Sequence, residues 1–313
     1  MTLSVCMIVK DEETFLEKCL RSLDWFYDEL IIVDTGSTDK TKEIAARFGA
    51  KVFDFKWVDD FSAARNFSLE KATSEWILVL DADELIENKD DVKKLMTLDF
   101  DAFTLVQKNF TYDKNNLEFV QAKIPVEGYF GYIPVEVVRL FRNKGYKFSG
   151  RVHELVDESL IAGKAKVGYS DAGILHLEAL KGNEQIRKKQ IQYLEYAKKQ
   201  LEIDPEDEKM LCDAGLICFY YLKDYLQAEE FLKKAKSARA KMLLGQMKVQ
   251  QGDLREAARH YEGIPEASYN LGEIYFALGV KEKSILNYMN ALKNGSKNEN
   301  EIRRKLSMLQ AKP

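Results

Sequence analysis

The sequence is poor in the features that mark secreted, membrane-spanning or nucleic-acid-coating proteins. Its 313 residues include only 5 prolines, 17 glycines, 4 cysteines and 3 histidines. The charges nearly cancel, with 47 Lys+Arg against 51 Asp+Glu, which argues against a nucleic-acid partner. No apolar run approaches the roughly 20 residues that a membrane helix needs, so no integral membrane segment is expected. Without C-x-x-C spacing, the cysteines are expected to be reduced thiols of a cytoplasmic protein.

The first 180 residues alternate short apolar runs with segments of helical period. Strands are expected at 3–9, 30–33, 51–55 and 75–80, and helices at 13–23, 40–48 and 61–72. This alternation of strands and helices predicts a parallel sheet covered by helices on both faces. Further strands at 102–110, 136–141 and 173–177, without helices between them, predict an antiparallel extension of the same domain. Such sheets bind ligands at the carboxyl ends of their strands.

From about residue 183 the strand signals vanish and the sequence becomes helical with internal similarity. The residues Gly245, Gly252, Ala257 and Tyr261 recur twenty-seven positions later as Gly272, Gly279, Ser284 and Tyr288. This pattern is similar to tetratricopeptide (TPR) helix pairs, although its period is shorter than the usual ~34 residues. An irregular helical bundle remains the alternative. We therefore expect two domains, an α/β domain over 1–180 and an all-α, TPR-like domain over 181–313.

The acidic run Asp81-Ala82-Asp83-Glu84 directly follows the apolar segment 77–80. A strand this apolar is expected to be buried, so its end delivers Asp81 and Asp83 to the ligand edge of the sheet. In extended geometry residues i and i+2 point to the same side, so the two carboxylates would face one point. Their mutual repulsion is relieved by a hard divalent cation, Mg²⁺ or Mn²⁺. The competing interpretation is an acidic, solvated turn.

Several segments together resemble family 2 glycosyltransferases of the GT-A fold, whose Rossmann-like sheet is mixed. They are Val5-x-Met7-Ile8-Val9-Lys10-Asp11-Glu12, residues 32–39 (IVDTGSTD), Ala64-Arg65-Asn66 and Leu80-Asp81-Ala82-Asp83-Glu84. Residues 139–143 (RLFRN) and 150–154 (GRVHE) are similar to a branch that carries C-terminal TPR repeats and includes bacteriocin S-glycosyltransferases. The resemblance covers most of 1–180 and implies a hexosyltransferase that uses a UDP-sugar donor.

The resemblance also implies roles for individual residues. Asp34 would contact the uracil, helped by the backbone near Val9, and Arg65 would face the nucleotide diphosphate. Asp83, with Asp81 beside it, would hold Mn²⁺ or Mg²⁺. His176, at the end of the last strand, is a candidate third metal ligand, although a lone histidine in an apolar strand is also often a core residue.

Inverting transfer needs a base that takes the proton of the acceptor. The pair His153-Glu154 is the best candidate, with Glu154 favoured as the base and His153 as its orienting neighbour. A structural pair at a strand edge is the alternative. A zinc-protease site is excluded because the H-E-x-x-H motif lacks its second histidine here.

Three functions fit this sequence. The first is a metal-dependent, inverting glycosyltransferase whose helical half selects a protein or peptide acceptor. The second keeps the enzyme but assigns it a glycan or lipid-linked acceptor, with the repeats used for homodimerisation. The third is a non-catalytic TPR scaffold, against which the intact acidic residues count. A nucleotidyltransferase is more distant, because the glycine-rich loop expected near residue 10 is missing.

Overall fold

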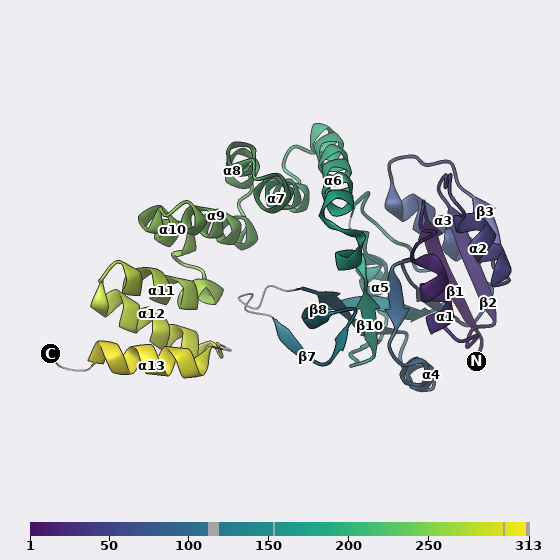
Figure 1. Cartoon of the computed structure of the whole chain (residues 1–313), viewed down its shortest axis with the longest axis horizontal. Helices are drawn as coiled ribbons and strands as arrows, with labels where there is room; N and C mark the ends of the chain where they lie inside the picture. Colours follow the sequence, from purple (N-terminus) through teal and green to yellow (C-terminus); the bar gives the residue numbers. More distant parts are fainter. Residues whose placement is uncertain (112–118, 153, 297, 311–313) are drawn as a thin grey trace. The chain divides into compact units, whose positions relative to one another are not determined.

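The computed structural model describes residues 1–111, 119–152, 154–296 and 298–310, and it divides into two compact units (Figure 1). The first unit is Met1–Ile186 and the second is Arg187–Pro313, a division a few residues beyond the expected position 180. Within the described residues, no helix combines the length and the apolar character that a membrane crossing requires.

The first unit is built on a mixed sheet, which has ten strands in the described residues. The strands are β1 (Leu3–Val9), β2 (Glu29–Asp34), β3 (Lys51–Asp54), β4 (Trp76–Val79), β5 (Glu84–Ile86), β6 (Ala102–Phe110), β7 (Val120–Val126), β8 (Tyr129–Arg142), β9 (Val167–Gly168) and β10 (Gly173–His176). The helices are α1 (Leu16–Ser22), α2 (Thr41–Arg47), α3 (Phe61–Lys71), α4 (Lys89–Met96), α5 (Asp157–Ala162) and the 3-10 helix η1 (Glu178–Lys181).

The strand order is β3-β2-β1-β4-β8-β6-β10-β5, with β7 beside β8 and β9 beside β6. The strands β3, β2, β1 and β4 run parallel, as the alternating pattern predicts. The expected antiparallel extension is only partly right. β8 is antiparallel to β4 and β6, but β9 and β10 run parallel to β6. β8 is antiparallel to β6 and ends beside the start of β6, so strands that begin from this end, as β9 and β10 do, run parallel to β6.

The two faces of the sheet have separate cores, as the alternation of side chains along β1 requires. Leu3, Val5 and Met7 are buried on one face with apolar residues of α1, α2 and α4. Cys6 is buried on the other face with residues of α3 and α5. Because both faces are covered by helices, the edge formed by the strand ends is left to bind ligands.

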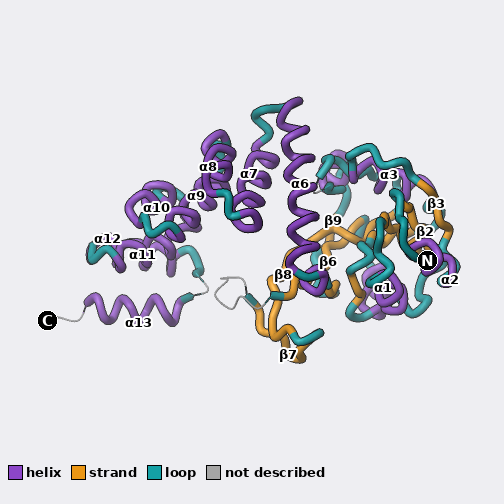
Figure 2. Tube along the Cα trace, turned by 45° about the horizontal axis from the view of Figure 1, so that its top comes forward, coloured by secondary structure: helices purple, strands orange, loops and turns teal. Residues whose placement is uncertain are grey.

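The second part of the chain is all-α, and Figure 2 shows the strands confined to the segment before α6. The predicted fold class, a mixed α/β sheet domain followed by a TPR-like helical domain, is confirmed. The helices are α6 (Asn183–Ile203), α7 (Glu208–Leu216), the π-helix η2 (Ile217–Leu222), α8 (Tyr225–Lys234), α9 (Ala238–Gln250), α10 (Leu254–Tyr261), the 3-10 helix η3 (Pro265–Ala267), α11 (Ser268–Ala277), α12 (Lys281–Lys293) and α13 (Glu299–Gln310).

The twenty-seven-residue repeat has a packing reason. Gly245 on α9 lies against the ring of Tyr261 on α10, and Gly272 on α11 lies in the same way against Tyr288 on α12. A side chain at either glycine would occupy the space of the ring, so each helix pair needs a small residue opposite a large one. The repeated glycine and tyrosine positions in the sequence are therefore one contact made twice.

Replacing Gly272 by alanine is expected to destabilise the helical unit by about 2 kcal/mol, because a side chain is forced into a filled core. A Cβ atom there would lie 2.5 Å from Cδ1 of Tyr288. The ring is fully buried and its hydroxyl donates to Glu273 Oε1 over 2.6 Å, so it cannot move aside easily. Thermal unfolding followed by circular dichroism measures the change. Asn290→Ala, at an exposed position of α12, is the control. An unchanged melting curve for Gly272→Ala would contradict the packing argument.

Candidate active site

The candidate site lies along the edge where parallel strands of the sheet end. β1 ends at Val9, β2 at Asp34 and β10 at His176, while Asp81 and Asp83 follow β4. β2, β1 and β4 are neighbours in the sheet, so two strand spacings, about 10 Å across the sheet, separate the strand that carries Asp34 from β4. The polar residues expected at this edge therefore do share it.

Asp34 closes β2 and is almost completely buried, with 1% of its surface exposed. Its Oδ1 accepts hydrogen bonds from the backbone N–H groups of Gly36 and Ser37, at 3.0 and 2.9 Å. Gly36 has a positive φ of 113°, a conformation that favours glycine in this turn. Asp34 Oδ2 is also buried, and no residue described here donates a hydrogen bond to it. Buried acceptors of this kind are rare and need an explanation, such as a ligand that donates to them.

Val9 lies beside Asp34 in the register of β1 and β2. Its carbonyl oxygen accepts from the backbone N–H of Thr35 at 2.9 Å and from the Thr35 hydroxyl at 3.1 Å. Lys42, on α2, places its Nζ 3.7 Å from Asp34 Oδ1. The loop after β2 is thus pinned to the end of β1, which fixes the position of Asp34.

The acidic run after β4 is not extended, so that part of the sequence prediction is wrong. The backbone N–H of Glu84 donates to Asp81 O over 3.0 Å, which closes a turn across residues 81–84. The Glu84 side chain stabilises this turn, because its Oε2 accepts from the Asp81 N–H at 2.8 Å. The side chains of Asp81 and Asp83 consequently have different partners.

Asp81 is held between two arginines. Arg65, on α3 and only 3% exposed, donates from Nη2 to Asp81 Oδ1 and from Nε to Glu154 Oε1 over 3.1 Å. Arg139, on β8, donates from Nη2 to Asp81 Oδ2 over 3.1 Å and to Glu84 Oε1 over 2.8 Å. Burial would raise the pKa of Asp81, but Arg65 and Arg139 outweigh it and hold that pKa far below its usual range. Burial, reinforced by Asp81, raises the pKa of Glu84 despite Arg139.

Asp83 lies in a second cluster, among residues from distant parts of the first unit. Its Oδ2 is 2.9 Å from Lys181 Nζ and 3.6 Å from His176 Nε2. Lys181 also pairs with Glu12 Oε1 at 2.7 Å. Burial alone would lower the pKa of both Lys181 and His176, but the carboxylate of Asp83 raises each above its ordinary value, with Glu12 adding to the effect on Lys181.

Asp83 and His176 together fit a divalent metal ion. His176 Nδ1 lies 2.7 Å from Asn109 Oδ1, and a proton on Nδ1 of a neutral ring would leave the Nε2 lone pair available to a metal ion beside Asp83. Two ligand atoms that are each about 2.1 Å from one ion lie about 3 to 4 Å apart, as these two do. No set of three His, Cys, Asp or Glu side chains able to hold a metal occurs among the described residues. Mg²⁺ and Mn²⁺ commonly need only one or two protein ligands when phosphate and water supply the rest.

The structure brings the predicted residues into three groups. Val9 and Asp34 lie together, Arg65 joins Asp81 to Glu154, and Asp83 faces His176. His153 lies outside the described residues. Five charged groups of the site received no role from the sequence: Glu12, Lys42, Glu84, Arg139 and Lys181. Glu12, Glu84 and Arg139 lie within the motifs that carried the family resemblance, whereas Lys181 follows the last strand without any local signal.

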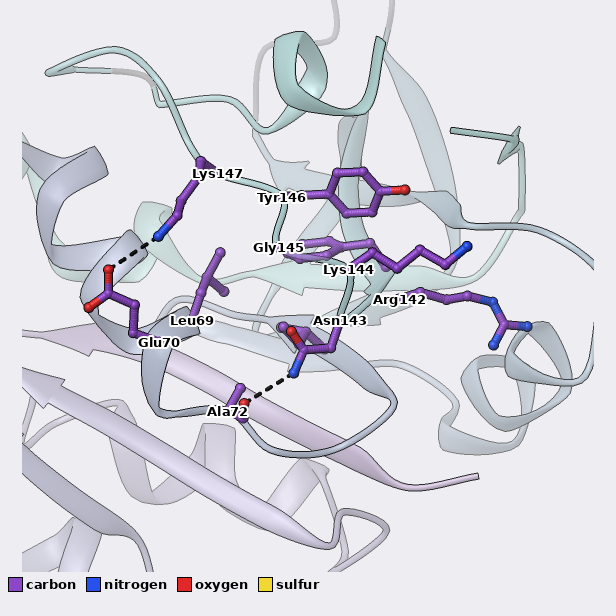
Figure 3. A pocket seen from close by; sticks show the side chains of 11 residues that line it. Leu69, Glu70, Ala72, Arg142, Asn143, Lys144, Gly145, Tyr146 and Lys147 are labelled. Atoms are coloured by element: carbon purple, nitrogen blue, oxygen red, sulfur yellow. Dashed lines mark hydrogen bonds and ion pairs between the residues drawn. The ribbon is translucent and has the colours of Figure 1, made fainter. Parts of the chain in front are cut away.

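A separate pocket of about 260 Å³ lies where β4 begins, away from the candidate site (Figure 3). Its wall includes apolar residues such as Leu69 and Phe141. At its rim, Lys147 pairs with Glu70, and Asn143 Nδ2 donates to Ala72 O over 3.1 Å. None of the site residues predicted from the sequence lines this pocket.

A sequence model of a known family matches part of the first unit. Residues 4–154 match the sequence model described as glycosyl transferase family 2. That segment includes Asp34, Arg65, Asp81, Asp83 and Glu154, so most of the candidate site lies inside the match.

Two curated relatives match about half of the chain. A TPR repeat-containing protein of Synechococcus elongatus is 42% identical over 161 residues, covering 51% of this chain and 36% of that protein. The SPbeta prophage-derived glycosyltransferase SunS of Bacillus subtilis is 35% identical over 159 residues, covering 49% and 34%. The chain thus matches about a third of the length of these relatives. Among solved structures, residues 1–349 of S. aureus TarS in complex with UDP-GlcNAc align with a TM-score of 0.45 and 16% identity, covering 95% and 93% of the two chains.

Proposed function

We propose that the protein transfers a sugar from a UDP-sugar to a peptide or protein acceptor, with inversion at the anomeric carbon. The premise is the match of residues 4–154 to the glycosyl transferase family 2 model. One observation carries the proposal. Asp34, the Asp81–Asp83 turn and His176 lie along a single sheet edge, and all but His176 fall inside the family match. The residues that would bind a base, a diphosphate and a metal are therefore together in one GT-A domain.

Asp34 would read the nucleobase. Its buried Oδ2 lacks a hydrogen-bond donor among the described residues, and the N3–H of uracil is a donor of the required kind. Arg65 and Arg139 would lie beside the diphosphate, where their orientation is fixed by Asp81. Because Arg65 Nε also holds Glu154, the same guanidinium would link the donor side of the site to the acceptor side.

Asp83 and His176 would hold Mn²⁺ or Mg²⁺. Asp81 would lie beside this metal site, with its carboxylate paired to Arg65 and Arg139. Once bound, the ion would neutralise the charge that develops on the departing diphosphate. Glu154 would accept the proton of the acceptor as the acceptor atom bonds to the anomeric carbon and the bond from that carbon to the diphosphate oxygen breaks. UDP then leaves from the opposite face of the sugar, which is why the configuration inverts.

The acceptor is proposed from the helical unit, residues 181–313, while residues 1–180 would carry the donor chemistry. TPR-like arrays present extended surfaces that suit peptides. The resemblance of residues 139–143 and 150–154 to enzymes of the bacteriocin S-glycosyltransferase type supports a peptide or protein acceptor, while the match to the glycosyltransferase SunS supports sugar transfer. Mass spectrometry of candidate acceptors after incubation with UDP-sugars tests this part. Transfer to a lipid-linked glycan alone would replace the peptide by that acceptor and assign the repeats to dimerisation.

The nucleobase contact gives the sharpest test of the proposed donor. Wild-type protein is expected to bind UDP more tightly than CDP, because cytosine has an acceptor at N3 where uracil has a donor. Asp34→Asn retains the Oδ1 that holds the turn but replaces Oδ2 by an NH₂ donor. We expect this change to weaken UDP binding by about 10- to 100-fold and to favour CDP, since a hydrogen bond is exchanged for two facing donors.

Isothermal titration calorimetry with both nucleotides and Mn²⁺ measures this preference. Asp99→Asn, at a fully exposed carboxylate, is the matched control and should leave both affinities unchanged. If wild-type protein binds UDP and CDP equally, or Asp34→Asn weakens both to the same extent, Asp34 does not read the base.

A further inference from the structure

Lys181 is paired with more carboxylates than a structural ion pair requires. Its ammonium group lies between two carboxylates, 2.9 Å from Asp83 Oδ2 and 2.7 Å from Glu12 Oε1, and its side chain is only 13% exposed. It also lies over the ring of Phe15, 5.4 Å from the centroid. Lysine is seldom buried to this extent, and one carboxylate would be enough to balance its charge.

The same oxygen of Asp83 faces two groups. Asp83 Oδ2 is the atom approached by both Lys181 Nζ and His176 Nε2. A divalent ion held by Asp83 and His176 would lie about 2.1 Å from that oxygen. The ammonium group and the ion would then be only a few ångströms apart in a poorly solvated site, where like charges repel strongly. Both cations therefore cannot be bound to Asp83 in the present arrangement.

Glu12 provides the place to which the lysine can retreat. It holds the ammonium group independently of Asp83, from the loop after β1. Lys181 is the last residue of η1, and the next residue, Gly182, has a positive φ of 78° and no atom near the position of a Cβ. The backbone beside Lys181 is therefore not packed against other atoms on the Cβ side of Gly182.

We propose that Lys181 is a displaceable counter-ion: in the free protein it occupies the cation position at Asp83, and a divalent metal binds only by displacing it onto Glu12. This inference rests on the proposed function, because it takes the metal position from it. Its consequence is that the protein alone binds Mn²⁺ weakly. Donor diphosphate, which supplies further ligands and negative charge, would then be needed for tight metal binding.

Titration of the full-length protein with Mn²⁺ in the absence of nucleotide tests the inference, with free Mn²⁺ followed by electron paramagnetic resonance. Lys181→Met is expected to bind Mn²⁺ about tenfold more tightly than wild type, because a competing cation is gone. Lys181→Arg keeps the charge and should stay near the wild-type affinity. Lys166→Met removes an exposed lysine that is paired with Asp99, and it controls for the change in net charge.

Glu12→Gln gives a second, opposite result. Without Glu12 the displaced lysine has no partner, so Mn²⁺ binding should weaken, and this effect should largely disappear in the Lys181→Met background. Glu12→Gln also carries the test if Lys181→Met proves unable to fold. Equal or weaker binding by folded Lys181→Met, or an undiminished Glu12→Gln effect in the double variant, would overturn the inference. If wild type does not bind Mn²⁺ even with UDP present, the proposed metal site fails instead.

Discussion

Asp83→Asn is expected to lower the rate of sugar transfer by about 10³-fold, one of the two largest effects that we predict. The loss of one anionic ligand weakens both the binding of the metal and its neutralisation of the leaving diphosphate, which is worth several kcal/mol in the transition state. The substitution keeps the shape of the side chain but removes its charge. The lysine that pairs with Asp83 still has Glu12 as a partner, so we expect the domain to remain folded.

The measurement is the initial rate of UDP release from a UDP-sugar at saturating Mn²⁺, with melting curves to check the fold. Asp90→Asn, at an exposed position in the first turn of α4, is the matched control and should retain the wild-type rate. If folded Asp83→Asn keeps more than about a tenth of the rate, the metal cannot depend on this carboxylate, because a lost ligand to a catalytic ion costs far more.

The parts of the fold that could be predicted are those encoded by local patterns. The strand expected at 3–9 agrees with β1 because its residues form one apolar run buried on both faces. The glycine and tyrosine repeat of the helical unit is also visible in the sequence, since the same contact is made between consecutive helices. Short edge elements such as β5 and β9 were not predicted, because two or three residues carry no period.

The site was predicted only as far as strand ends determine it. The position of Asp34 follows from the end of a buried strand, and that of His176 from the end of β10. The turn at 81–84 depends on the Glu84 side chain, which accepts a hydrogen bond from the Asp81 backbone. The contacts of Lys181 with Glu12 and Asp83 join segments that are far apart in the sequence. No local pattern contains such contacts, so they could not be inferred from composition or spacing.

The family resemblance located Arg65 and Glu154 but not their contact. Both side chains are largely buried, and one guanidinium joins Glu154 to Asp81. This arrangement bears directly on the proposed base, because a substitution at Glu154 could act either on proton transfer or on the position of Arg65. A useful variant must therefore separate these two effects.

Glu154→Gln is the variant that separates them, and it is expected to lower kcat for transfer by about 10³-fold while UDP affinity changes little. Glutamine cannot take a proton from the acceptor, and loss of a general base typically costs about 10²- to 10⁴-fold. It retains Oε1 as an acceptor for Arg65 Nε, so Arg65 and Asp81 should keep their positions. Transfer rates and UDP titrations on the same preparations measure both quantities. Glu158→Gln, at an exposed position in α5, is the control.

His153→Gln, made in parallel, decides between the two neighbours. If Glu154 is the base, its substitution lowers kcat by about 10³-fold, whereas His153→Gln retains a much larger share of the transfer rate. If His153 is the base, the two outcomes exchange. A third pattern, in which Glu154→Gln loses UDP affinity in proportion to its rate, would mean that Glu154 serves to hold Arg65. The base would then have to be sought elsewhere, because a carboxylate needed only for donor binding cannot account for activation of the acceptor.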